Sequence, residues 1–125
     1  MSKNHHQQPQ WLPDVKENNF PAAASYLGLI YPGDQVEKLV AELRAAAISQ
    51  FKAKDIFRAS GLSLLGVSNF HVKRDRQKIQ EGTPLSPLLL VKDKMNGKVV
   101  IADGYHRLCA VYGFDEDAWI PCKIA

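Results

Sequence analysis

The chain changes from strand to helix within one short stretch, Val99-Val100-Ile101-Ala102-Asp103-Gly104-Tyr105-His106-Arg107-Leu108-Cys109-Ala110. An apolar run of strand character stops at Asp103-Gly104, and apolar residues then recur at helical spacing. Such a junction leaves unpaired backbone N–H groups at the positive end of a helix, beside a fixed cation. These are the components of an anion site, and the ligand that fits them best is a phosphate.

Several residues at this junction are suited to a phosphate ligand. Gly104 permits a tight turn and lets ligand oxygens come close to the amides that follow, those of Tyr105 to Arg107. The guanidinium of Arg107 can hold two phosphate oxygens at once. His106 can donate a hydrogen bond or transfer a proton near neutral pH, and Asp103 can orient the ligand or act as a base. We therefore take Asp103 and His106 as candidate catalytic residues.

The same residues also have structural roles open to them. Asp103 is a suitable N-cap for the helix that follows it, and Gly104 can serve the turn alone. His106 can be a hydrogen-bonded core histidine. Arg107 can form an ion pair with one of the carboxylates that follow the helix, Asp115, Glu116 or Asp117. Residue chemistry by itself leaves both interpretations open.

The composition indicates one compact domain. The chain has 125 residues, of which 46% are hydrophobic and 23% charged, with a formal net charge of +3, and this is an ordinary globular mixture. No run approaches the about 20 apolar residues that span a bilayer, and the amino end is polar, so we expect a cytoplasmic protein without a membrane segment. Cys109 and Cys122 are the only cysteines, and we expect both to be reduced core thiols. No set of side chains has metal-ligand spacing.

Basic residues are concentrated in one part of the chain. Seven lie within residues 52–78, against two carboxylates, Asp55 and Asp75. One interpretation is a solvated helix face, and the other is an electropositive rim that attracts an anionic ligand. Phe57 and Phe70 are the only aromatic residues interleaved with these charges. A nucleic-acid-binding surface therefore ranks lowest among the functions considered for this segment.

Breaks and hydrophobic spacing divide the chain into three parts. We expect a flexible tail over 1–10, an N-terminal arm and helices over 11–50, and a domain over 51–125, all in one compact unit. The expected helices cover 21–27, 34–48, 52–60, 71–80 and 105–112, and the expected strands cover 88–91, 98–102 and 119–124. The apolar segment Leu62–Val67 is either a further strand or an irregular buried stretch. Pro121 lacks a ladder donor, which predicts that the last strand lies at a sheet edge or begins there.

Three motifs follow one another in the second half of the chain. They are Lys54-Asp55-Ile56; then Lys78-Ile79 through Gly82, Pro84-Leu85 and Leu88–Val91; then Ile101 to Ala110, followed by Ile120-Pro121. In order and spacing these motifs resemble the ParB/sulfiredoxin superfamily of domains. The resemblance implies an α/β (α+β) fold with a small mixed sheet flanked by helices, to which the first 50 residues add a helical extension.

The resemblance also implies roles for individual residues. In that superfamily a Gly-x-His-Arg turn binds nucleotide phosphates, so Gly104, His106 and Arg107 would contact phosphate, and Lys78 with its helix would supply a second positive wall. Two features depart from the family. Tyr105 stands where sulfiredoxins have their reactive cysteine, and the chain stops after the final strand, where partition proteins continue into a DNA-binding region. We therefore expect neither sulfinic acid reduction nor a complete partition protein.

The leading hypothesis is a stand-alone domain that binds a nucleotide or another phosphate-bearing ligand, with phosphotransfer or phosphohydrolase as the activity that it could support. Mg²⁺ would arrive with a nucleoside triphosphate and bridge its phosphate oxygens. Lys78 and Arg107 would neutralise charge during transfer, and His106 or Asp103 would move the proton.

Two other classes of function remain as alternatives. One is a non-enzymatic interaction or regulatory module that docks through residues 11–50, with a second copy of the chain as a candidate partner for residues 21–50. The other, ranked lowest, is a nucleic-acid-binding or nuclease domain that uses the basic segment 52–78.

Overall fold

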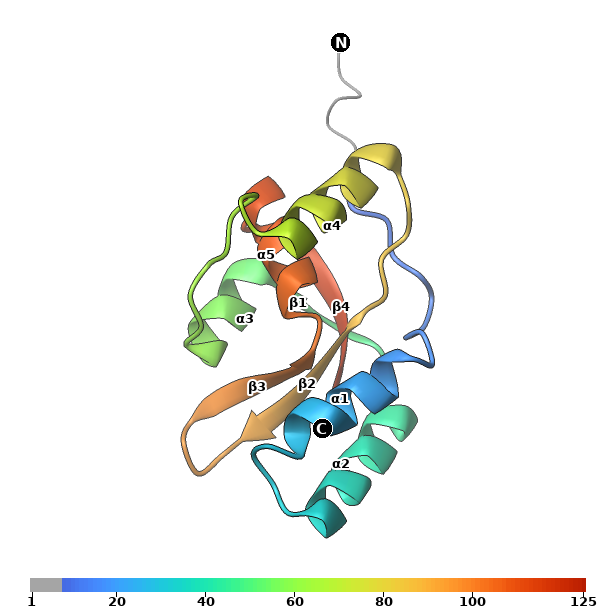
Figure 1. The fold of residues 1–125 in the computed structure, drawn as a ribbon, viewed down its shortest axis with the longest axis vertical. Helices are drawn as coiled ribbons and strands as arrows, with labels where there is room; N and C mark the ends of the chain where they lie inside the picture. Colours follow the sequence, from blue (N-terminus) through green and yellow to red (C-terminus); the bar gives the residue numbers. More distant parts are fainter. Residues whose placement is uncertain (1–7) are drawn as a thin grey trace.

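The computed structural model describes residues 8–125 of the chain, and residues 1–7 are drawn as a grey trace (Figure 1). Most of the tail predicted over 1–10 therefore lies outside the described residues. At its end, the carbonyl oxygen of Gln10 accepts a hydrogen bond of 2.8 Å from the amide of Leu85. The chain is thus held to the body of the domain from Gln10 onwards.

The described residues form a four-stranded mixed sheet. Its strands are β1 (Ser49–Lys52), β2 (Leu88–Asp93), β3 (Lys98–Asp103) and β4 (Trp119–Ile124), in the order β1-β4-β2-β3. The β2–β4 pair is parallel, whereas β1–β4 and β2–β3 are antiparallel. Together with the helices this sheet confirms the predicted α+β fold class.

Five helices cover the two faces of this sheet (Figure 1). Side chains alternate between the faces of a strand, and β2 shows what each face meets. Leu89 and Val91 lie in the core cluster that holds the buried residues of α1 (Asn19–Leu27) and α2 (Gly33–Ala45). Leu88 and Leu90 lie in the other cluster, with the buried residues of α3, α4 and α5 (Ala53–Ser60, Phe70–Glu81 and Tyr105–Phe114). The N-terminal extension therefore packs against one face of the sheet and closes one of the two core clusters.

The predicted helix over 34–48 is too long. The helix ends at Ala45, Ala46 is extended, and the chain enters β1 at Ser49. The reason is tertiary, since the four residues of β1 pair with β4 from Ser49↔Cys122 to Lys52↔Trp119. Antiparallel pairing to a neighbouring strand satisfies backbone groups that a further helical turn would otherwise pair.

The apolar segment Leu62–Val67 is irregular rather than a strand, and most of it is exposed, with Leu65 partly buried against the core. It follows Gly61, which ends α3 at φ 69°, and the side chains of Leu62, Leu64 and Val67 are exposed. The segment is attached to α5 rather than to the sheet, because Ser63 accepts a hydrogen bond from the Tyr105 hydroxyl and Leu65 donates one to Cys109 Sγ.

Of the two alternatives for the last strand, an edge position throughout is wrong, because β4 lies between β1 and β2, but the strand does begin with a neighbour on one side alone. Pro121 is nevertheless tolerated there for a local reason. Pairing with β2 begins only at Cys122, opposite Leu88, so at Pro121 the strand has a neighbour on one side alone, namely β1. The missing N–H therefore falls where no second ladder needs it.

Both cysteines are buried thiols without a disulfide partner. Burial raises the pKa of Cys109, and it raises the pKa of Cys122 to about 12.

In residues 8–125, every helix falls short of the length and apolar character needed to cross a bilayer.

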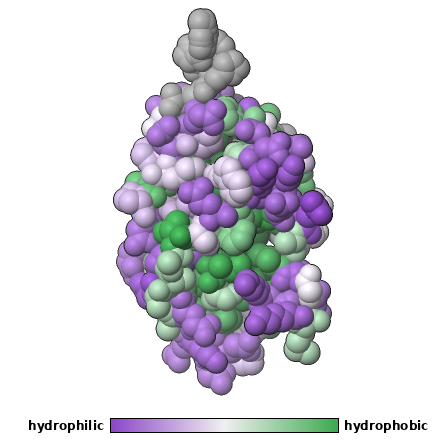
Figure 2. Space-filling model, turned by 180° about the vertical axis from the view of Figure 1, so that it is seen from behind, coloured by the Kyte–Doolittle hydropathy of each residue, from purple (hydrophilic) through white to green (hydrophobic). Residues whose placement is uncertain are grey.

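The helices leave part of the sheet uncovered. An apolar hollow of about 260 Å³ lies between the short helix α3 and the strands, with Ile56, Leu90 and Val99 among its lining residues. Apolar surface is visible in the middle of the rear side of the molecule, surrounded by hydrophilic residues (Figure 2).

Candidate anion-binding site

The strand-to-helix junction requires glycine at position 104. Gly104 has φ 110° and ψ 14°, a left-handed conformation, and a Cβ atom there would lie 2.7 Å from Leu88 Cγ and 2.9 Å from Arg107 Nη2. The first amide of α5 with a partner is that of Leu108, which donates to Gly104 O at 2.9 Å. In the part of the chain that the structure describes, no side chain caps α5. The backbone N–H groups of the first helical turn are therefore left for water or a ligand.

Asp103 does not cap α5, contrary to the structural alternative considered for it. Its Oδ2 atom instead accepts a hydrogen bond of 3.0 Å from Arg107 Nη2, one helical turn later. Arg107 likewise does not pair with the carboxylates after the helix, and one of these, Asp117, lies 2.6 Å from Lys54. Both side chains are thus turned back towards the start of α5.

The guanidinium of Arg107 is held at one nitrogen and left unpaired at another. Its Nη2 atom donates to Asp103 Oδ2, to Asn19 Oδ1 at 3.2 Å and to Pro87 O at 3.4 Å. Its Nε atom is buried and has no hydrogen-bond partner among the described residues. A buried donor without a partner costs about 1–3 kcal/mol. The side chain is therefore oriented by the bonds of Nη2, while its Nε–H stays without an acceptor among the described residues.

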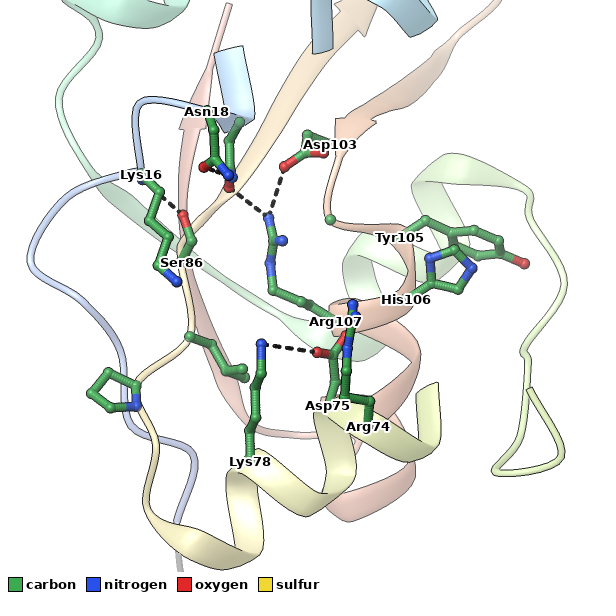
Figure 3. A pocket seen from close by; sticks show the side chains of 14 residues that line it. Lys16, Asn18, Arg74, Asp75, Lys78, Ser86, Asp103, Tyr105, His106 and Arg107 are labelled. Carbon is green, nitrogen blue, oxygen red and sulfur yellow. Dashed lines mark hydrogen bonds and ion pairs between the residues drawn. The ribbon is translucent and has the colours of Figure 1, made fainter. Parts of the chain in front are cut away.

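A pocket of about 310 Å³ lies in front of this arginine (Figure 3). Four cationic side chains line it, from the N-terminal arm, α4 and α5: Lys16, Arg74, Lys78 and Arg107. Two carboxylates line it as well, and each has a cationic neighbour. Asp103 binds Arg107, and Asp75 lies 3.9 Å from Lys78 Nζ. Four cations and two carboxylates leave a formal surplus of two positive charges.

The N-terminal arm forms one wall of the pocket. Trp11 pairs with Leu85 in an isolated parallel bridge, and the amide of Lys16 donates to Ser86 Oγ at 3.0 Å. These bonds place Lys16 opposite α4 and α5 (Figure 3), and Asn19 lines the same pocket. Lys16, Asn19 and Ser86 were not predicted as site residues, because nothing local in the sequence indicates where the arm packs, and Arg74 was predicted only as one of the basic residues of 52–78.

Tyr105 and His106 also line the pocket, but their rings point away from the Arg107 guanidinium (Figure 3). The Tyr105 hydroxyl donates to Ser63 O, and the ring of His106 lies 4.8 Å from that of His71. Burial lowers the pKa of His106, and the nearby His71 lowers it further. Its imidazole is therefore neutral near pH 7.

The predicted site residues thus divide into two groups. Lys78, Gly104 and Arg107 come together around the pocket, with the backbone amides of Tyr105 and His106 beside them. The side chains of the two candidate catalytic residues are engaged elsewhere, since Asp103 binds Arg107 and His106 packs against His71.

Residues 8–125 contain no group of three or more His, Cys, Asp or Glu side chains that could hold a metal ion. Comparison of the chain with protein-family models, with curated proteins and with solved structures found no match.

Proposed function

We propose that this protein binds a phosphate-bearing ligand, with a nucleotide as the class that its motifs favour, in the pocket in front of Arg107. The observation that carries the proposal is a pocket lined by four cationic side chains against two carboxylates, with the Arg107 guanidinium oriented there by Asp103 and Asn19. A phosphate dianion would neutralise that surplus, and its oxygens would accept from a guanidinium edge.

Three cationic side chains would hold the ligand from different directions. Lys16 comes from the N-terminal arm, Lys78 from α4 and Arg107 from α5, and their ends face a common space (Figure 3). The amides at the start of α5 add donors at the positive end of a helix dipole. The Gly-x-His-Arg resemblance of residues 104–107 supports the same assignment.

The side chains of Asp103 and His106 are oriented in a way that suits ligand binding but not proton transfer. A general base must reach the proton that it removes, whereas Asp103 is bonded to Arg107 and the His106 ring packs against His71 of α4. Phosphotransfer or phosphohydrolysis would need one of them to reorient. With a nucleoside triphosphate, Mg²⁺ would come bound to phosphate oxygens rather than be held in a protein cage.

Thermal unfolding with phosphate compounds tests the proposal. Inorganic phosphate, pyrophosphate and a nucleoside triphosphate with Mg²⁺ are compared with chloride at equal ionic strength. A ligand at a hundredfold excess over its Kd stabilises the folded state by about 2.7 kcal/mol. For a domain of this size about 1 kcal/mol corresponds to about 4 °C, so Tm should rise by about 10 °C.

Two variants and a control connect the shift to this pocket. Lys16→Ala removes a cation and keeps the hydrogen bond to Ser86, because the backbone amide of Lys16 donates that bond. Lys78→Gln removes a second cation, and Lys94→Ala removes the same charge from the exposed turn between β2 and β3. Both pocket variants should shrink the shift, and the control should keep it. The proposal is refuted if no phosphate compound raises Tm, or if all three variants respond alike.

A further inference from the structure

Four aromatic side chains gather beside the pocket, at the starts of α4 and α5. We call them the aromatic cluster: Phe70, His71, Tyr105 and His106. The ring centroids are 5.6 Å apart for Phe70–His71, 4.8 Å for His71–His106 and 5.6 Å for Tyr105–His106. These separations are those of interacting aromatic rings, so the cluster is continuous from Phe70 to the helix that carries Arg107.

The cluster adjoins the phosphate pocket through three residues. Tyr105 and His106 belong to the cluster and also line the pocket, and Arg74 lines the pocket while its guanidinium lies 6.0 Å from the Phe70 ring centroid. Phe70, Arg74 and Lys78 follow one another at intervals of four along α4, so they share one side of the helix. At about 1.5 Å per residue this stripe is about 12 Å long, with a ring at one end and an ammonium group at the other.

The aromatic side chain of Phe70 lies at the surface, at the first position of α4. Its side chain is 71% exposed, although it belongs to a residue type that is usually buried. The side chain of Asn69 caps α4 by accepting from the amides of His71 and Val72 at 2.9 and 3.2 Å. The start of the helix is therefore fixed, and the position of Phe70 outside the core follows from it.

We infer that the aromatic cluster binds the base of a nucleotide whose phosphate occupies the pocket. The inference rests on the proposed function and narrows it, from any phosphate compound to one that carries a planar aromatic ring. A base that stacks on Phe70, the exposed ring of the cluster, gains surface contact that a sugar phosphate lacks. Arg74 lies between the two subsites and can contact both the ring and the phosphate.

The charge state of the cluster favours stacking. Burial and the neighbouring His71 lower the pKa of His106, so the imidazole next to the pocket is neutral near pH 7 and presents an uncharged face.

The same chemistry, a base joined to a phosphate, occurs in free nucleotides and in single-stranded nucleic acid. Of the two aromatics that interleave the basic segment in sequence, Phe70 lies at this site and Phe57 packs against Tyr112 in the core.

Isothermal titration calorimetry with matched ligands tests the inference. Ribose 5-phosphate carries the phosphate without a base, and adenosine and cytidine 5′-monophosphates add one. Stacking of one base on aromatic side chains should raise affinity by about five- to 150-fold over ribose 5-phosphate. A short oligothymidylate, titrated in parallel, distinguishes a strand from a free nucleotide as the better source of the base.

Variants at position 70 assign the gain to the cluster. Phe70→Ala should abolish the preference for nucleotides over ribose 5-phosphate and leave ribose 5-phosphate affinity unchanged, whereas Phe70→Tyr should keep the preference. Leu64→Ala is the matched control, because Leu64 is also an exposed apolar side chain, at 51%, but is not part of the cluster.

The outcomes separate the inference from the function on which it rests. If ribose 5-phosphate binds as tightly as the nucleotides, or if Phe70→Ala keeps their preference, the base subsite is refuted and phosphate binding stands. If no phosphate compound binds, both are refuted. A nucleotide preference that depends on Phe70 supports the inference, whether the free nucleotide or the oligonucleotide binds more tightly.

Discussion

Replacement of Gly104 by alanine should destabilise the protein strongly, for two separable reasons. At φ 110° any residue with a Cβ atom is strained, at about 1–2 kcal/mol. The new methyl group would also lie 2.7 Å from Leu88 Cγ, on a side chain that is fully buried in β2. Overpacking of this kind costs about 1–3 kcal/mol, so the two effects together lower the free energy of unfolding by about 2–5 kcal/mol.

Two other glycines make it possible to measure each contribution. Gly61 also has a positive φ, 69°, but open space around its Cβ position, so Gly61→Ala reports the strain alone. Gly66 has open space and no positive φ, so Gly66→Ala reports neither effect. We expect the order of stability to be Gly66→Ala, then Gly61→Ala, then Gly104→Ala.

Urea unfolding followed by circular dichroism measures these differences. With a denaturant dependence of about 1–3 kcal/mol per molar urea, a loss of about 3 kcal/mol lowers the midpoint by about 1–3 M. The reasoning is refuted if Gly104→Ala unfolds at the same midpoint as Gly61→Ala, because contact with Leu88 and Arg107 would then add nothing to the strain.

Three further predictions follow from the site and the core. Asn19→Asp should keep the fold, because a carboxylate can still accept from Arg107, but should weaken phosphate binding at least tenfold in calorimetry; equal affinity would show that the pocket charge does not matter. The pKa of His106 is lowered from 6.5 in the folded state, so the unfolded state binds the proton first and stability should fall as pH drops from about 7.5 through 6.5. His106→Gln should reduce this slope in urea titrations, and an unchanged slope contradicts the assignment. Cys109 and Cys122 have raised pKa values and are buried, so a thiol reagent should label them only in urea; rapid labelling of the native protein would disprove their burial.

The local features of the fold could be predicted from the sequence. The apolar run before Asp103, the glycine after it and the helical spacing beyond it are all decided within about ten residues, and the structure has β3 and α5 there. The ends of α3 and α4 are of the same kind, because Gly61 and Gly82 adopt the left-handed conformation that terminates a helix.

Features that depend on distant partners could not be predicted in this way. β1 is only four residues long and is defined by its pairing with β4, about seventy residues later. Leu62–Val67 is apolar enough to suggest burial, but its attachment to α5 leaves most of it at the surface. Hydrophobicity indicates that a segment can be buried, whereas tertiary contacts decide whether it is.

The candidate anion-binding site shows most clearly why local sequence features could not identify its complete set of residues. Arg107 is oriented in part by Asn19, 88 positions earlier in the chain. Asn19 begins α1, and α1 is held by Ala23 and Leu27, which are fully buried against the sheet. The packing of the N-terminal extension therefore sets the geometry of the guanidinium, and a ligand that binds the guanidinium must in turn stabilise the docked extension, because binding equilibria are linked to folding equilibria. Ligand binding at the Gly-x-His-Arg turn should therefore protect the extension from unfolding, although the sequence resemblance covers only the turn.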